Sequence, residues 1–259
     1  NAQNITKWLN NHNQKHPIAE VYWGYRTKPD GVDAANPGDI FLKYQNGGML
    51  GVSLKAGGSA TKEPILNTYV KPLFNYFGKP NDYLKLKKSL FPQYRAAGVS
   101  ELDIKTKWGS SQLAQKLGKF EKENPKEYNR LYDINLALVK QAVINLFNSD
   151  IKKTKKFIKS QILKTQLKTP FIKVKATTTT AYVDNTYDQL QAGLEAATSI
   201  VASDAGGSKQ DFIIRLTDGI TLNMEFSARS NKSGFLHKLG QFENLSVKFN
   251  AIGGFTKNR

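Results

Sequence analysis

The stretch Pro37-Gly38-Asp39-Ile40-Phe41-Leu42, followed by Gly51-Val52-Ser53-Leu54-Lys55, decides the fold predicted for this chain. Between the two segments lies Gln45-Asn46-Gly47-Gly48, a composition typical of a tight turn. Apolar and polar residues alternate on both sides of this turn, which predicts two antiparallel strands. The sequence therefore predicts a β-hairpin that carries an acid, a hydroxyl and a lysine.

The register of this hairpin follows from the length of its loop. A three-residue loop Asn46-Gly47-Gly48 would pair Asp39 with Lys55 and Phe41 with Ser53. Because side chains alternate along a strand, Asp39, Ser53 and Lys55 are expected on one face. The apolar neighbours then form the other face. A shift of the register by one residue would separate the three polar side chains.

Positive charge dominates the composition. The chain has 259 residues, with 38 Lys and Arg against 21 Asp and Glu, a formal net charge of +17. Dispersed cations favour a polyanionic partner, nucleic acid first and an anionic membrane surface second. No apolar run is long enough to cross a membrane, and the N-terminus lacks the apolar core of a signal peptide. We expect a soluble, cytoplasmic protein.

The composition also excludes several kinds of site. Cysteine is absent, which excludes disulfides, thiol nucleophiles and cysteine zinc sites. The only histidines are His12, His16 and His237, and the first two are interpreted as the end of a polar helix. The chain also lacks a phosphate-binding loop with Gly-Lys-Ser/Thr spacing. Any metal must therefore be bound through oxygen, which favours Mg²⁺ or Mn²⁺.

Hydrophobic periodicity predicts an α/β protein with a helical middle region. A short helix is expected over residues 3 to 14, followed by an aromatic strand over 21 to 26. Glu63 and Pro64 would open a further helix, with Glu63 at the positive end of its dipole. A buried helix capped at Asn124 is expected next, and another over 187 to 200.

A basic helix is expected to begin at Ser149 and Asp150. It contains the densest group of lysines in the chain, among them Lys152, Lys153 and Lys156. Such a helix could lie along a phosphate backbone, or its lysines could form an ordinary solvated face.

A second hairpin is expected near the C-terminus. With Thr217-Asp218-Gly219 as a three-residue loop, Ile214 would pair with Leu222 and Phe212 with Met224. The Ser/Gly-containing loop that follows this hairpin carries the basic residues Arg229, Lys232 and Lys238. These residues are expected either to contact DNA or to belong to an ordinary surface loop.

The hairpin from Asp39 to Lys55 resembles the PD-(D/E)XK nuclease superfamily, the fold of many restriction endonucleases, junction resolvases and repair nucleases. In that family an acidic residue begins one strand, and an acidic-x-Lys triplet lies on the next. Pro37-Gly38-Asp39 and Ser53-Leu54-Lys55 stand in these two places. The order of helix and strands over residues 3 to 75 agrees as well.

The resemblance implies a restriction-endonuclease-like fold, a central mixed β-sheet flanked by helices. The nuclease-like core with the basic helices would occupy residues 1 to 165. Residues 166 to 259 would form a C-terminal α+β region with the second hairpin, which binds DNA or completes the same sheet.

The resemblance also implies a metal-dependent endonuclease of restriction or phage type that hydrolyses DNA phosphodiester bonds with Mg²⁺ or Mn²⁺. Asp39 would be the principal metal ligand, and Lys55 would polarise the attacking water. Ser53 stands where the family has Asp or Glu, so a second carboxylate is expected from Glu63 or, alternatively, from Glu20. Lys62 would contact a phosphate.

The expected partner is double-stranded DNA, and cleavage of both strands would favour a two-fold dimer. A first alternative is a non-catalytic nucleic-acid-binding protein on the same fold, in which Ser53 marks lost activity. A second is a cross-strand ion pair between Asp39 and Lys55 on a solvated face. A basic membrane-surface protein would explain the charge but not the hairpin.

Overall fold

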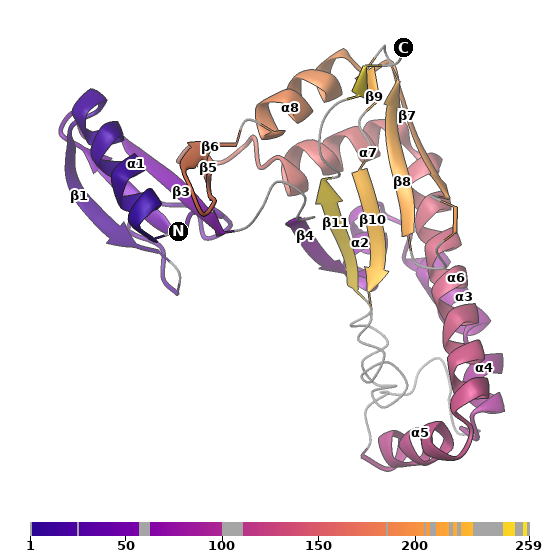
Figure 1. Cartoon of the computed structure of the whole chain (residues 1–259). Helices are drawn as coiled ribbons and strands as arrows, with labels where there is room; N and C mark the ends of the chain where they lie inside the picture. The colour runs from indigo at the N-terminus through magenta and orange to yellow at the C-terminus, as the bar shows by residue number, and fades with distance from the viewer. Residues whose placement is uncertain are drawn as a thin grey trace. The chain divides into compact units, whose positions relative to one another are not determined.

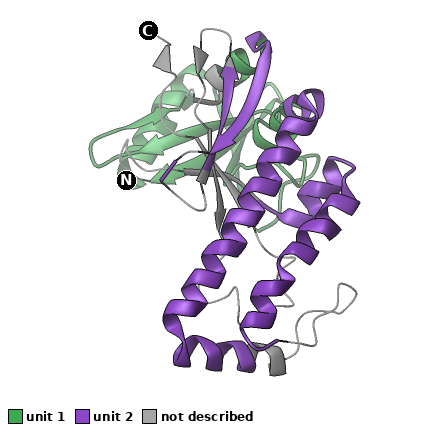
Figure 2. Ribbon diagram, turned by 90° about the vertical axis from the view of Figure 1, so that its right-hand side faces the viewer, with its two compact units in different colours: residues 1–61, 158–195 green, residues 62–157, 196–259 purple. Residues whose placement is uncertain are grey.

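The computed structural model describes residues 2–24, 26–56, 63–99, 111–184, 186–204, 206–207, 211–217, 220–221, 224–229, 246–251 and 256–257. These residues fall into two compact units (Figure 2). The first unit comprises residues 1–61 and 158–195, and the second comprises 62–157 and 196–259. The boundary expected at residue 165 thus lies inside the first unit. In the described part of the chain, no helix is long and apolar enough to span a membrane.

The first unit is a five-stranded mixed sheet with the order β1-β2-β3-β5-β6. Its elements are α1 (Ala2–Lys15), β1 (Ile18–Trp23), β2 (Ile40–Tyr44), β3 (Met49–Ala56), a π-helical turn (Ile158–Ile162), β5 (Phe171–Ala176), β6 (Ala181–Val183) and α8 (Thr186–Ala196). Neighbouring strands are antiparallel, except that β3 and β5 are parallel.

Helix α1 covers one face of this sheet (Figure 1). Trp8 and Leu9 of α1 pack against a buried cluster formed by Ile40, Leu42, Val52 and Val174. The opposite face carries the alternate residues of the same strands, which include the polar side chains of the predicted site.

The register of the first hairpin differs from the predicted one by two residues. Lys43 pairs with Met49 and Ile40 with Val52, so Asp39 comes beside Ser53 rather than Lys55. The loop begins one residue earlier than expected, because Gly47, with φ of +83°, takes the left-handed position. Since the shift is an even number of residues, the predicted faces are preserved.

The second unit contains an antiparallel sheet with the order β4-β11-β10-β8-β7. Its strands are β4 (Glu63–Tyr69), β7 (Ser199–Asp204), β8 (Asp211–Thr217), β10 (Met224–Arg229) and β11 (Ser246–Ala251), and β9 (Ile220–Thr221) pairs separately with β12 (Thr256–Lys257). Its helices are α2 (Val70–Tyr76), α3 (Pro80–Ser89), α4 (Phe91–Ala96), α5 (Ser111–Glu123), α6 (Pro125–Ser149) and α7 (Ile151–Phe157).

Aromatic side chains form the core of this unit. Phe147 of α6 lies edge-on to Phe77 and Phe157, with ring centroids 5.3 and 5.5 Å apart, and its centroid is 6.3 Å from that of Phe212 in β8. All four side chains are buried. Helix α6 is therefore the core helix that its apolar pattern predicted, and it begins at Pro125 as expected.

Two local predictions were wrong. Glu63 and Pro64 do not open a helix but begin strand β4, an edge strand in which Pro64 lies at an irregular pairing with β11. Such a position tolerates proline, which has no N–H to donate. The helix expected over 187 to 200 ends at Ala196, and Ile200 lies in β7.

The C-terminal hairpin is present with a register shifted by two residues. Ile214 pairs with Met224 instead of Leu222, and Phe212 pairs with Phe226. Ile220 and Thr221 leave this ladder and pair with β12. The coarse prediction is confirmed: the protein is a mixed α/β structure with a five-stranded mixed sheet, helices and a C-terminal β-hairpin.

Candidate functional site

Asp39 is held between two strands of the first unit. Its N–H donates to the Val52 carbonyl at 2.9 Å, and its carbonyl accepts from the Gly24 N–H at 2.9 Å. Its carboxylate oxygen Oδ2 accepts from the Leu54 N–H at 2.7 Å, and Ser53 Oγ lies 3.5 Å from the same oxygen. Asp39 is therefore fixed against β3 by its backbone and by its side chain.

The segment before Asp39 is fixed by two further side chains. Asn36 is buried, donates from Nδ2 to the Thr169 carbonyl at 2.9 Å and accepts from the Gly38 N–H at 2.9 Å. Lys28 donates from Nζ to the carbonyls of Gly24 and Gly38 at 2.9 and 2.7 Å. These bonds hold the approach to Asp39 in one conformation, because breaking them would leave buried polar groups unpaired.

Lys28 also places a positive charge near Asp39. Its Nζ lies 5.3 Å from the centroid of the buried Phe41 ring. Partial burial lowers the pKa of Lys28, and the charge of Asp39 acts in the opposite direction.

The polar row continues across the sheet from Asp39. Ser53 lies beside Lys173 and Lys55 beside Lys175 in the parallel pairing of β3 with β5. The Asp184 N–H donates to the Lys173 carbonyl at 2.8 Å, just after β6 ends. One row therefore runs from Asp39 through Ser53 and Lys173 to Asp184.

Asp184 is shared by the two lysines of β5. Its Oδ2 lies 3.4 Å from Lys173 Nζ and 3.5 Å from Lys175 Nζ. The three side chains are only 10%, 9% and 14% exposed, respectively. At this depth the two ammonium groups need an anionic neighbour.

Asp184, Lys173 and Lys175 were not predicted from the sequence as site residues. Lys173-Val174-Lys175 repeats the polar-apolar-lysine alternation of Ser53-Leu54-Lys55, so a local signal was available. What the sequence pattern could not indicate is the parallel pairing of β5 with β3, because more than 100 residues separate the two strands.

The alternative of an Asp39–Lys55 ion pair is not found. Asp39 lies beside Ser53, and among the described residues no ion pair joins its carboxylate to Lys55. Lys55 lies on the same face, two residues further along β3.

Glu20 is bound elsewhere on the sheet. It lies opposite Lys43 in the β1–β2 ladder, forms an ion pair with it at 2.7 Å and accepts a hydrogen bond from the Tyr22 hydroxyl. The hydrogen bond from Lys43 lowers the pKa of Glu20. Lys43 lies four residues from Asp39 along the strand, about 13 Å. The register therefore keeps Glu20 away from any ion bound at Asp39.

Glu63 begins strand β4, where its backbone pairs with that of Ala251, and both residues belong to the second unit. The side chain of Glu63 lies outside the described residues. Lys62, Lys232 and Lys238 also lie outside them. Arg229 ends strand β10, opposite Ser246. The roles expected for these residues stay predictions.

The lysines of α7 differ from one another in their contacts. Lys153 donates from Nζ to the Phe77 carbonyl at 2.9 Å, where α2 ends. A lysine at a helix C-terminus stabilises the last carbonyl groups, so Lys153 has a structural contact. Lys152 and Lys156 are exposed on the same helix.

Oxygen ligands for a metal are few at this site. In the described part of the chain, no group of three or more Asp, Glu, His or Cys side chains could hold a metal ion. Mg²⁺ is commonly bound by one or two carboxylates together with waters and substrate phosphates. Asp39 would be one protein ligand of such an ion, with the remaining positions left to waters and phosphates.

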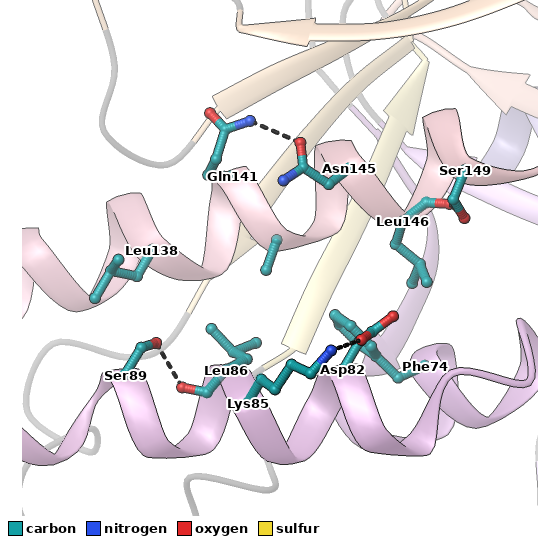
Figure 3. A pocket seen from close by; sticks show the side chains of 11 residues that line it. Phe74, Asp82, Lys85, Leu86, Ser89, Leu138, Gln141, Asn145, Leu146 and Ser149 are labelled. Atoms are coloured by element: carbon teal, nitrogen blue, oxygen red, sulfur yellow. Dashed lines mark hydrogen bonds and ion pairs between the residues drawn. The ribbon is translucent and has the colours of Figure 1, made fainter.

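A pocket of about 500 Å³ lies in the second unit between α3 and α6 (Figure 3). Leu86 and Leu146 line it, and its rim carries an Asp82–Lys85 ion pair at 3.0 Å and a hydrogen bond from Gln141 to Asn145 at 2.9 Å. It contains none of the predicted site residues.

In comparisons with protein-family models, curated proteins and solved structures, no match to this chain was found.

Proposed function

We propose that the protein is a metal-dependent endonuclease of restriction or phage type that cleaves DNA at the polar face of the first unit. The observation that carries this proposal is the contact of the Asp39 carboxylate with Ser53 and Leu54, on the strand and face that also carry Lys55. The net charge of +17 supports a nucleic acid as substrate.

The order of the helix and strands in the first unit also supports the proposal, although it is less specific than the contacts of Asp39. A helix followed by a three-stranded meander, with the helix on the apolar face, is the order on which the resemblance to the PD-(D/E)XK superfamily rests. The family assignment itself is part of this proposal.

The residues have distinct roles in the proposed reaction. Asp39 would hold Mg²⁺, which when bound supplies charge neutralisation and a more acidic water. Lys55 would orient the attacking water and stabilise negative charge that develops on the phosphate. Ser53 would donate a hydrogen bond to the Asp39 carboxylate or to a phosphate oxygen, since serine is a poor metal ligand.

One observation favours a second candidate function, a DNA-binding protein that does not cleave. The Leu54 N–H already occupies one Asp39 oxygen at 2.7 Å, so this carboxylate also serves the structure of the hairpin. A protein that had lost its second carboxylate could retain Asp39 for that reason alone.

Plasmid cleavage with purified protein tests the proposal. We expect nicked or linear product with Mg²⁺ or Mn²⁺ and none with EDTA, and a rate reduced at least about 100-fold in Lys55→Met, the size of loss typical when a stabilising cation is removed. Lys7→Met, on α1, is the matched control and should cleave at the wild-type rate. Binding without cleavage in the wild type would select the second candidate function, and equal rates in Lys55→Met and Lys7→Met would refute the role of Lys55.

A further inference from the structure

Three aromatic rings follow one another along α1 and end at the surface of the first unit. Trp8 and His12 are stacked, with ring centroids 5.0 Å apart and ring planes 19° from parallel, and the centroid of His16 lies 4.9 Å from that of His12. The spacing of four residues places the three rings on one face of the helix. Trp8 packs against the core of the sheet, whereas His16 is exposed. The column of rings therefore ends at the surface with His16.

A pocket of about 460 Å³ lies at this end of the column. Its lining comes from the end of α1 and from the turn between β2 and β3, and consists of Lys15, His16, Pro17, Tyr44, Gln45 and Asn46. None of these six residues is acidic, and Lys15 is a cation. The pocket therefore favours an anionic ligand.

Two hydrogen bonds hold the walls of the pocket together. The Gln45 N–H donates to the Pro17 carbonyl at 3.0 Å, which ties the turn to the end of α1. The Tyr44 hydroxyl shares a hydrogen bond of 2.8 Å with His12 Nε2, and the Tyr44 and His16 ring centroids are 6.2 Å apart. The aromatic wall is thus built before a ligand binds, as in most ligand pockets.

The polar side chains of this pocket have donors to offer a ligand. In the described part of the chain, no hydrogen bond or ion pair engages the side chains of Lys15 and Gln45. Asn46 accepts from the Gly48 N–H through Oδ1 at 3.0 Å, a bond that does not use its Nδ2 donors. An ammonium group binds phosphate, and side-chain amides match the hydrogen-bonding edges of nucleobases.

We propose that this pocket binds one unpaired nucleotide, with its base stacked on His16, its phosphate at Lys15 and the amides of the turn at the edge of the base. Stacking on aromatic side chains together with a nearby cation is how proteins hold single-stranded nucleic acid. A base inside a duplex is already stacked on both faces and paired at its edge, so it cannot extend the column.

This pocket is separate from the proposed cleavage site. Tyr44 follows Asp39 by five residues along β2, about 17 Å, and the rings of α1 lie on the apolar face of the sheet. The inference therefore does not rest on the proposed cleavage. The nucleotide could belong to a single strand or be a free mononucleotide, because both present the same base and phosphate.

Proton NMR of the full chain in EDTA tests the stacking directly. The chain has three histidines, so its imidazole C–H signals are few, and the signal missing in His16→Gln belongs to His16. A thymidine strand of eight nucleotides, or dTMP, should move this signal upfield, because a stacked base shields the ring protons beside it. Deoxyribose 5-phosphate, which has no base, and the same strand paired in a duplex should leave it nearly unmoved.

Calorimetric titration with the thymidine strand and with a base-free strand of equal length measures the contribution of the base. His16→Ala should weaken binding of the thymidine strand about 10-fold and leave the base-free strand unaffected, whereas His16→Phe keeps a ring and should bind like the wild type. Circular dichroism confirms that each variant is folded.

The salt dependence of the same titrations measures the phosphate contact. Lys15→Gln should weaken binding of both strands and lower the slope of log K against log salt by about 0.7, the value for one contact with a single strand. Lys7→Gln is the matched control, since Lys7 is also exposed on α1 but lies two turns earlier. It should change the slope by less than half as much.

Several results would overturn the proposal. One is a His16 signal that neither dTMP nor the single strand moves, and another is a duplex that moves it as far as the single strand. Equal losses of His16→Ala on the thymidine and base-free strands would exclude stacking, and equal slopes in Lys15→Gln and Lys7→Gln would exclude the phosphate contact. A signal moved by the strand but not by dTMP assigns the pocket to single-stranded nucleic acid, and one moved equally by both assigns it to free nucleotides as well.

Discussion

At the scale of single residues, polar side chains of the first unit hold the main chain in place through hydrogen bonds. Asn36, Lys28 and Asp39 each accept from or donate to main-chain groups around the start of β2. The sequence identified Asp39 from its place in a motif. It could not identify Asn36, because the carbonyl that Asn36 binds belongs to Thr169, 133 positions away.

His12 gives this unit a pH dependence. It stacks on Trp8 and shares a hydrogen bond of 2.8 Å with the Tyr44 hydroxyl, and Lys15 follows on the same helix. Burial lowers the pKa of His12 from 6.5, and the charge of His16 lowers it further. The folded state thus favours the neutral ring, so this contribution to stability is complete above pH 6.5 and declines as the pH falls toward the pKa of the folded state.

Urea unfolding at pH 7.5 and pH 5.5 checks this prediction. The free energy of unfolding should fall more between these pH values in the wild type than in His12→Gln. His16→Gln removes only the second cause and should give an intermediate difference. Identical pH dependence in the wild type and His12→Gln would show that the ring titrates alike in both states.

At the scale of elements, the two hairpins show what local patterns determine. Alternation of apolar and polar residues gave the correct faces in the first hairpin, and also in β8, where Phe212, Ile214 and Leu216 are buried, because burial selects the face. The turn residues gave the wrong pairing, since both Gly47 and Gly48 could take the left-handed loop position. A register error of two residues changes which residues pair across the two strands, but each side chain stays on its predicted face of the sheet.

The positions of the long helices were predicted more accurately than the ends of shorter elements. Helices α1 and α6 follow a helical period over several turns, and both lie where expected. The strand β4 was mistaken for a helix because Glu63-Pro64 is typical of a first turn. Its pairing with β11, some 180 residues later, overrides that local preference.

The Phe41 side chain of β2 depends on glycines around it. A Cβ at Gly24 would overlap the Phe41 ring, which is fully buried and cannot move aside. We expect Gly24→Ala to lower the free energy of unfolding by about 1–3 kcal/mol, as overpacking does. Gly48→Ala is the control, since its Cβ would lie 3.2 Å from the exposed Asn46 side chain, and should cost less than about 0.5 kcal/mol. Urea titration measures both, and equal effects would contradict the packing argument.

At the scale of the whole molecule, a segment of the second unit is inserted in the sequence of the first unit. Residues 62–157 of the second unit separate β3 from β5 of the first, so the polar face is assembled from distant parts of the sequence. A boundary at residue 165 was expected because composition changes there. Composition does not reveal that β5 returns to pair with β3, and so half of the candidate site was not predictable from sequence.

The central claim is that Asp39 belongs to a DNA-cleaving site on the first unit. Asp33 offers a matched control, because its Oδ2 accepts from the Lys168 N–H at 2.8 Å much as Asp39 accepts from the Leu54 N–H. In both residues, replacement of aspartate by asparagine keeps a side-chain oxygen that can accept from the main-chain N–H. It removes one negative charge, and asparagine has nearly the same size as aspartate.

Cleavage of supercoiled plasmid with Mg²⁺ by Asp39→Asn and Asp33→Asn is the most direct measurement. The proposal predicts that Asp39→Asn loses at least about 100-fold in rate while still binding duplex DNA in EDTA, because charge at the metal and phosphate is lost but the fold is kept. Asp33→Asn should cleave within a few-fold of the wild type. Equal rates in the two variants would contradict the claim.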